Sequence, residues 1–186
     1  NYDSCLNLGG IANISFGNSG NIKAFDVCGC NILLNKYSKI YDREFDESGQ
    51  LSSRGKVIPE LIESLDSISY NQIEGPKSLD KEKLLKDNYK VIDEYLTNKS
   101  DIDLKRIGYD VLATIVEHIS NEIFSVVSKQ NNLKNILITG GGAKNIFLIE
   151  QIKRKINCSV IIPDEILVDY KAVSYTHLTL PTIVSV

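Results

Sequence analysis

The chain has 186 residues, of which 42% are hydrophobic and 24% charged, and its formal net charge at pH 7 is −3. This length suits one globular domain with its own hydrophobic core. Lysine and arginine are spread along the chain, which argues against nucleic acid as a partner. No apolar run approaches the roughly 20 residues needed to span a bilayer, so no membrane partner is expected either.

The four cysteines match no disulfide framework, which favours a reducing, cytoplasmic location. Cys28 and Cys30 flank Gly29 and could indicate metal or redox chemistry. A zinc site, however, normally takes four ligands. We therefore expect this segment to be a packed loop.

The first part of the chain predicts three short strands, over 4–8, 12–16 and 22–26, followed by a helix over 31–41. The segment 42–55 is polar and rich in turn residues. Its acidic residues are expected to be solvated: Asp42, Asp46 and Glu47. Pro59 then opens a short helix that ends near Leu65.

The segment 66–102 has more charge and less periodicity, and we interpret it as an insertion or cap over a site, with a short helix around 80–96. A long helix is predicted over 103–129 from apolar residues at helical spacing. His118 falls on this helix and is expected to be a structural or surface histidine without a catalytic role.

The last part predicts a buried strand over 135–139, a glycine triplet, a helix that ends near 156 and a buried strand over 160–162. An antiparallel meander followed by alternating helices and strands is typical of a layered α/β domain with a mixed sheet.

Gly9 and Gly10 join the first two predicted strands, and glycine lets backbone N–H groups approach an anion closely. Asp26 is expected at the end of the third strand, at the mouth of the same sheet, where its carboxylate could accept a proton. A phosphate-binding loop beside a carboxylate that can act as a general base indicates phosphoryl transfer. Alternatively, Asp26 caps the helix that follows it.

Gly140, Gly141 and Gly142 lie between a predicted strand and a predicted helix, where backbone N–H groups and a helix N-terminus would favour negative charge. A tight turn that needs glycine for its φ angles explains the triplet equally well. Neither G-x-G-x-x-G nor a P-loop is present, which argues against a Rossmann or Walker site. Lys77 and Ser78 follow Gly75-Pro76 and either contact phosphate or sugar, or form a plain turn.

Several segments, in this order and spacing, resemble the C-terminal half of the anhydro-N-acetylmuramic acid kinase family, within the actin/hexokinase/Hsp70 ATPase superfamily. The resemblance covers roughly residues 4–171. The matching segments are Asn7-Leu8-Gly9-Gly10-Ile11-Ala12-Asn13, Phe25-Asp26 to Asn31, Gly75-Pro76-Lys77-Ser78, Thr139 to Asn145, Asp164-Glu165 and Asp169-Tyr170-Lys171.

The resemblance implies a ribonuclease-H-like, actin-like ATPase fold with a mixed sheet flanked by helices, and ATP with Mg²⁺ as cofactors. It implies a reaction in which hydrolytic opening of a 1,6-anhydro bridge is coupled to phosphorylation of O6, giving N-acetylmuramate 6-phosphate in cell-wall recycling. The partner would be a small amino sugar, and the family also suggests a homodimer.

The resemblance further implies roles for single residues. Asp26 aligns with the catalytic base and also binds substrate, together with Asn31, Lys77 and Ser78. The second phosphate-binding turn would comprise Gly9, Gly10 and Asn13, and the adenosine-side turn Gly140, Gly141, Gly142 and Asn145. No residue of this chain is assigned to the metal.

The chain departs from the family pattern in three ways. The N-terminal lobe, with its G-x-[MI]-S-G-T-S phosphate turn, is absent, so we expect 1–171 to be the C-terminal lobe and to be inactive alone. Cys28-Gly29-Cys30 replaces Gly-Pro-Gly, and Ala172 replaces a sugar-contacting Glu. Residues 172–186 are Thr-rich, β-branched and broken by Pro181, and we expect this tail to be non-native.

Two other functions stay open from the sequence. The glycine turns are shared across the superfamily, so another sugar kinase or a small-carboxylate kinase fits them. The missing lobe also leaves room for a non-catalytic nucleotide-binding module.

Overall fold

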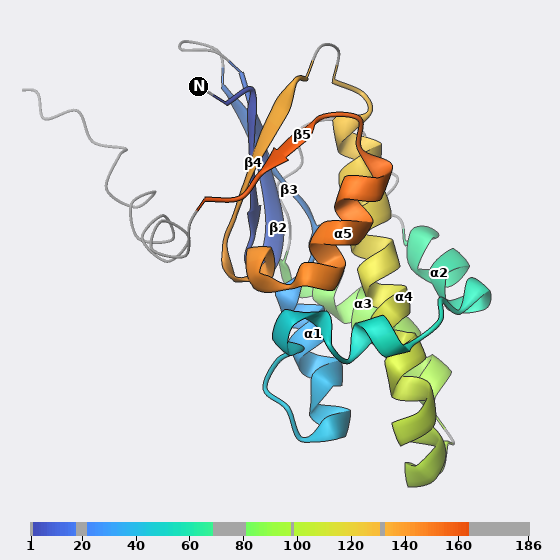
Figure 1. Ribbon diagram of the computed structural model, residues 1–186. Coiled ribbons are helices and arrows are strands. Elements are labelled where there is room, and N and C mark those ends of the chain that lie inside the picture. Colours follow the sequence, from blue (N-terminus) through green and yellow to red (C-terminus); the bar gives the residue numbers. More distant parts are fainter. Residues whose placement is uncertain (1, 18–21, 69–80, 98, 131–132, 164–186) are drawn as a thin grey trace, which may run out of the picture.

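A computed structural model describes residues 2–17, 22–68, 81–97, 99–130 and 133–163 (Figure 1). Lys77, Ser78 and the tail 172–186 lie outside the described residues, as does the middle of the expected insertion over 66–102. The strands are β1 (Ser4–Leu8), β2 (Ile11–Phe16), β3 (Lys23–Gly29), β4 (Asn135–Thr139) and β5 (Ser159–Ile161). The α-helices are α1 (Asn31–Ser38), α2 (Pro59–Asp66), α3 (Lys81–Leu96), α4 (Asp101–Val127) and α5 (Ile146–Lys155).

The strands form one mixed sheet in the order β3-β2-β1-β4-β5. β1, β2 and β3 pair antiparallel as a meander, whereas β4 pairs parallel to β1 and β5 pairs parallel to β4. A parallel partner needs a crossover connection, and the helices between β3 and β4 and between β4 and β5 provide it. The predicted mixed sheet with helices is confirmed.

Helix α4 is the centre of the core. It contacts α1, α2, α5 and β3, and Figure 1 shows it beside α5 on one side of the sheet, with α1 below the strands. Its predicted apolar stripe is confirmed, because Val111, Ile115, Ile119 and Ile123 have no exposed surface. In the described residues, no helix is both long enough and apolar enough to cross a membrane.

Helix α4 begins earlier than predicted, at Asp101, because Ser100 caps it. The Ser100 hydroxyl accepts a hydrogen bond from the Asp103 backbone N–H at 3.2 Å and donates one to the Asp103 carboxylate at 2.8 Å. This cap satisfies one of the N–H groups that a helix start leaves without a partner.

Asp46 differs from the prediction, since it is buried and only 6% of its surface is exposed. Its carboxylate accepts hydrogen bonds from the backbone N–H groups of Leu51 at 2.7 Å and Ser52 at 3.0 Å, and from the Ser52 hydroxyl at 2.6 Å. A buried carboxylate needs such donors. Asp46 therefore holds the segment 46–52 in one conformation instead of facing solvent.

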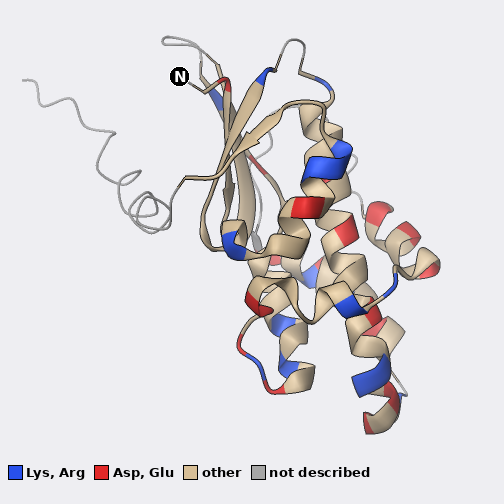
Figure 2. Ribbon diagram, in the orientation of Figure 1, with Lys and Arg blue, Asp and Glu red and all other residues tan. Residues whose placement is uncertain are grey.

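Cys28 and Cys30 are buried as predicted, with 1% and 0% exposure. The predicted loop is wrong in part, because Cys28 and Gly29 belong to β3 and only Cys30 lies between this strand and α1. His118 is also buried, at 1%. Its Nδ1 lies 2.9 Å from an Asp66 carboxylate oxygen on α2, so of the two expected roles the structure supports the structural one. Figure 2 shows acidic and basic residues interspersed over the helices, while the strands carry few charges.

The central position of α4 predicts a large effect of truncation there. Ile119→Ala should lower the free energy of unfolding by about 2–5 kcal/mol, because it leaves a cavity in a fully packed core. Ile102→Ala on the same helix removes a side chain that is 83% exposed and should change stability by no more than about 0.5 kcal/mol. Urea denaturation of both variants measures the difference, and equal losses would contradict this description of the core.

The cysteines should differ in alkylation rate. Burial raises the pKa of Cys30 to about 12, so at pH 8 the reactive thiolate is almost absent there. Burial also raises the pKa of Cys158, although that side chain is only partly buried. Mass spectrometry after iodoacetamide treatment of the folded protein at pH 8 should find the partly buried Cys5 and Cys158 labelled before the buried Cys28 and Cys30. Early labelling of Cys30 would show that its loop is not packed.

Candidate active site

A row of polar side chains crosses four strands near one end of the sheet. Asn7 on β1 pairs with Thr139 on β4 and with Asn13 on β2, and Asn13 pairs with Asp26 on β3. Directly paired residues share a face of a sheet. Leu6 and Leu8, which alternate with Asn7, are fully buried, so the polar row points to the opposite face.

Asp26 lies inside β3 and not at a strand end, because the strand continues to Gly29. Ala12 pairs with Cys28 while Asn13 pairs with Asp26, so Val27 is the extra residue of a β-bulge. The Asn13 side-chain amide donates a hydrogen bond to Asp26 Oδ1 at 3.0 Å, which orients a half-buried carboxylate. The alternative that Asp26 caps the next helix is wrong, since Cys30 occupies that position.

The turn at Gly9 and Gly10 is tied to the start of α1 through its carbonyl groups. Gly9 O accepts from the Asn31 N–H at 3.1 Å, and Gly10 O accepts from the N–H groups of Cys30 at 2.9 Å and Ile32 at 3.2 Å. The nearest heavy atom to a Cβ placed on Gly10 would be Ile32 Cβ at 3.9 Å. The turn thus serves as the N-terminal cap of α1, and Gly10 keeps an exposed, side-chain-free surface.

The glycine triplet follows β4 directly, and the three glycines have different surroundings. Gly140 has φ +84°, and a Cβ there would overlap Asn7 Oδ1 and lie 2.8 Å from the Leu8 carbonyl oxygen. A Cβ on Gly142 would lie 2.7 Å from Leu8 Cβ. Gly141 is exposed, and its Cβ would meet only Asn31 Nδ2, at 3.5 Å. The explanation by φ angles therefore holds for Gly140, whereas Gly142 is glycine for lack of space beside Leu8 and Gly141 stays open.

Asn31 joins the two glycine turns. Its side-chain amide donates to the Leu8 carbonyl oxygen at 3.0 Å, and its backbone N–H donates to Gly9 O. The same side chain faces Gly141 and Gly142. A residue predicted to contact substrate is thus also the anchor that fixes the separation of the two turns.

A cleft of about 720 Å³ opens beside Gly141 and Asn31. Its walls come from α1, from the segment around η2 (Glu47–Gly49), from η4 (Gly141–Lys144), and from the residues that follow β5. Phe45, Ile146 and Ile162 contribute exposed apolar surface, with 57%, 59% and 37% of their areas accessible. A cleft with apolar walls and a few polar groups is the usual form of a small-molecule site.

Asn145 lines this cleft, but its side chain already has a structural role. Its Oδ1 accepts a hydrogen bond from the Leu148 N–H at 3.0 Å and so caps α5. Helix α5 begins at Ile146, where the sequence predicts it, and the 3₁₀ turn η4 occupies the residues between Gly140 and Asn145. Gly49, with φ +76°, packs against Asn145 and Phe147 and brings the η2 segment onto this helix start.

The structure brings most of the predicted site residues to one end of the sheet. The polar row, the two turns and the starts of α1 and α5 contain Gly9, Gly10, Asn13, Asp26, Asn31, Gly140, Gly141, Gly142 and Asn145. Sequence reasoning gave no role to Asn7, Thr139 or Phe45. The signal for Asn7 was present, since a polar residue between Leu6 and Leu8 in a strand indicates the face away from the core.

Comparison with solved structures supports the fold class. The chain resembles component A of the (R)-2-hydroxyglutaryl-CoA dehydratase of Acidaminococcus fermentans, with a TM-score of 0.56 and 14% identity over 91% of this chain and 57% of that one. It also resembles the activator of the 2-hydroxyisocaproyl-CoA dehydratase of Clostridium difficile, solved with bound ADPNP, with a TM-score of 0.50 and 20% identity over 88% of this chain and 54% of that one. The chain has the actin-like ATPase fold.

Sequence comparison gives the family. The model of the family described as anhydro-N-acetylmuramic acid kinase matches residues 1–179, and the chain belongs to this family. The enzyme of that name from Francisella tularensis subsp. novicida is 30% identical over 167 residues, which are 86% of this chain and 42% of that protein. The one from Pelagibacter ubique is 31% identical over 183 residues, 89% of this chain and 43% of that protein. The chain thus spans less than half the length of these relatives.

The different roles within the triplet lead to a test. Gly140→Ala should destabilise the chain by about 1–3 kcal/mol, because alanine is strained at this φ and has no room beside Leu8. Gly141→Ala should change stability by less than about 1 kcal/mol. Thermal unfolding of the two variants measures this, and a Gly141→Ala loss as large as that of Gly140→Ala would contradict the assignment of Gly141 to an open surface.

Proposed function

We propose that this chain is the C-terminal lobe of an ATP-dependent kinase that opens 1,6-anhydro-N-acetylmuramic acid hydrolytically and phosphorylates O6. Membership of the family supports the class of enzyme. The single observation that carries the proposal is the meeting of the polar row, two glycine turns and an apolar cleft at one end of the sheet. The remaining part of the kinase would close the other side of this site.

The cleft would bind the adenosine of ATP. Its apolar side chains Phe45, Ile146 and Ile162 offer surface for a flat base. Gly141 borders the cleft, and Asn31 connects it with the turn at Gly9 and Gly10. Phosphates extending from the base past Gly141 would therefore reach glycine backbone without side chains in the way.

The Mg²⁺ that accompanies ATP takes oxygen ligands and is commonly bound by one or two carboxylates together with phosphates and water. Asp46 does not fit this role, since its carboxylate already accepts three hydrogen bonds. The exposed Glu47 in the cleft does fit it. When bound, the ion would neutralise charge on the phosphates.

Asp26 would act as the general base. Its carboxylate would take a proton from water while that oxygen forms a bond to the anomeric carbon, and the bond between this carbon and O6 would break. The freed O6 would then accept the γ-phosphoryl group of ATP. Asn13 would hold the Asp26 carboxylate in place through its amide, at 3.0 Å.

We infer the remaining partners from the same family resemblance. Asn31, Lys77 and Ser78 would contact the amino sugar, and the kinase would form a homodimer in the cytoplasm. No disulfide joins the four cysteines, which supports a reducing compartment. If the phosphoryl acceptor is another sugar or a small carboxylate, turnover measured with a panel of substrates would identify it.

Asp26→Asn in the full-length kinase should lower kcat by roughly 10²–10⁴-fold, because the amide cannot take the proton. Asparagine can still pair with Asn13, so the fold and ATP binding should be unchanged. The measurement combines release of sugar phosphate with calorimetric titration of ATP.

Asp42→Asn is the matched control for this experiment. Asp42 is exposed and has φ 57°, a conformation that asparagine also adopts, so this variant should retain full activity. Near-normal kcat in Asp26→Asn would overturn the role of Asp26 as base.

A further inference from the structure

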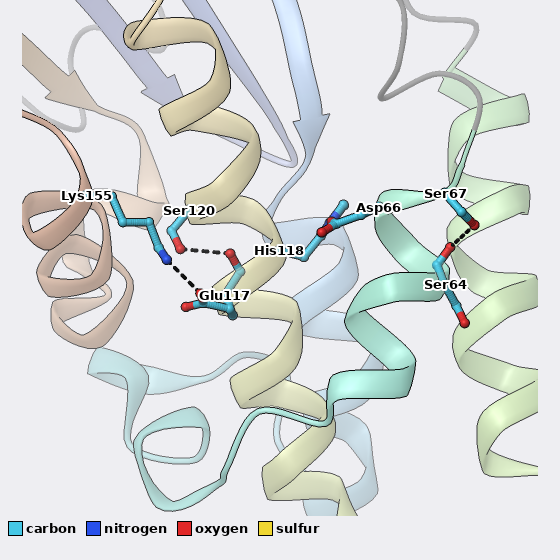
Figure 3. Close-up of polar contacts among 7 residues, drawn as sticks. All are labelled: Ser64, Asp66, Ser67, Glu117, His118, Ser120 and Lys155. Carbon is cyan, nitrogen blue, oxygen red and sulfur yellow. Dashed lines mark hydrogen bonds and ion pairs between the residues drawn. The ribbon is translucent and has the colours of Figure 1, made fainter.

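Three potential metal ligands lie together where α2 meets α4, away from the cleft. His118 and Glu122 are one helical turn apart on α4, and Asp66 is the last residue of α2. One ligand atom from each of the three lies within 4.8 Å of the others. Figure 3 shows Asp66 and His118 facing each other, while Glu117 points away toward Lys155 on α5.

The charge and burial of this cluster favour a cation. It joins two carboxylates to one imidazole, and the His118 side chain is 1% exposed while that of Asp66 is 46% exposed. Among the described residues, Asp66 is paired with His118 and not with a lysine or arginine. The C-terminal end of α2 also lies here, and the negative end of a helix dipole favours positive charge.

We propose that Asp66, His118 and Glu122 bind a first-row divalent transition metal of the zinc class. Imidazole is a preferred ligand of Zn²⁺ and its neighbours, whereas Mg²⁺ prefers oxygen ligands only. None of the three residues lines the cleft, so this ion is separate from the one that accompanies ATP. It would connect α2 with α4, and three protein ligands leave the fourth position of a tetrahedral site to water.

The three ligands come together only in the folded chain, so the ion would bind the folded state more tightly than the unfolded state. Binding would therefore stabilise the fold. The ligands come from two helices, and a hydrogen bond of 2.9 Å between Asp66 and His118 already joins these helices at the site. Bound metal would therefore hold α2 against the core helix.

The test uses the whole chain, freed of metal by a chelator, with Zn²⁺ as the probe. Calorimetry should find one strong site, and saturating Zn²⁺ should raise Tm by roughly 5 °C or more. Asp66→Asn and Glu122→Gln each remove one ligand with little change in shape. Each should weaken Zn²⁺ binding by more than about tenfold and abolish the rise in Tm.

Glu117→Gln is the matched control, because Glu117 lies next to His118 in the sequence but pairs with Lys155 at 2.6 Å. It should bind Zn²⁺ like the unaltered chain, and Mg²⁺ should produce no rise in Tm. Co²⁺ bound in place of Zn²⁺ should lack thiolate charge-transfer bands, which distinguishes this site from the cysteines. No Zn²⁺ binding, or unchanged binding in both ligand variants, would overturn the proposal.

Discussion

The parallel pairing of β1 with β4 is the constraint on which the site depends. Ser4 pairs with Ile136, and Asn7 pairs with Thr139. Asp3 fixes the start of this pairing, because its carboxylate accepts hydrogen bonds from the N–H groups of Lys134 at 2.8 Å and Asn135 at 3.2 Å. Since parallel strands end at the same edge, two glycine turns that are far apart in the sequence come to lie side by side.

The consequences of this pairing explain why the glycines are not interchangeable. Gly140 and Gly142 lie against Asn7 and Leu8 because the two strands end together, and any side chain would separate them. Gly141 lies outside this contact and borders the cleft. In this turn, Gly140 and Gly142 allow close packing against β1, and Gly141 is left exposed for a ligand. Close packing and ligand binding therefore explain different glycines of the triplet.

Much of the fold could be predicted from the sequence, because it rests on local periodicity. Burial of one face of β1 explains why Leu6 and Leu8 alternate with Asn7. Burial of one face of α4 explains the helical spacing of Ile115 and Ile119. The position of Asp26 could not be predicted, since the bulge at Val27 arises from pairing between β2 and β3. The burial of Asp46 depends likewise on donors five and six residues later folding back onto its carboxylate.

The site was predicted as a set of residues more completely than as a geometry. Family resemblance grouped Gly9, Asp26 and Gly141 into one site, but it did not reveal that the Gly9 and Gly10 carbonyl groups are used to cap α1. Nor did it reveal that Asn145 caps α5. The bonds of the Gly9 and Gly10 carbonyl groups join segments that only the tertiary structure brings together, so the sequence does not indicate them. The Asn145 cap is local, because its partner Leu148 lies three residues later, and asparagine before a helix is a sequence signal for an N-cap.

The most direct test of the proposed nucleotide site is an NMR titration of the isotopically labelled chain with a non-hydrolysable ATP analogue and Mg²⁺. We expect the amide signals of Gly10, Asn31, Gly141 and the cleft residues to shift together with one dissociation constant, while those around Asp66 on α2 stay in place. Absence of shifts at Gly141 and Asn31, or shifts confined to another surface, would contradict the assignment of the cleft to ATP.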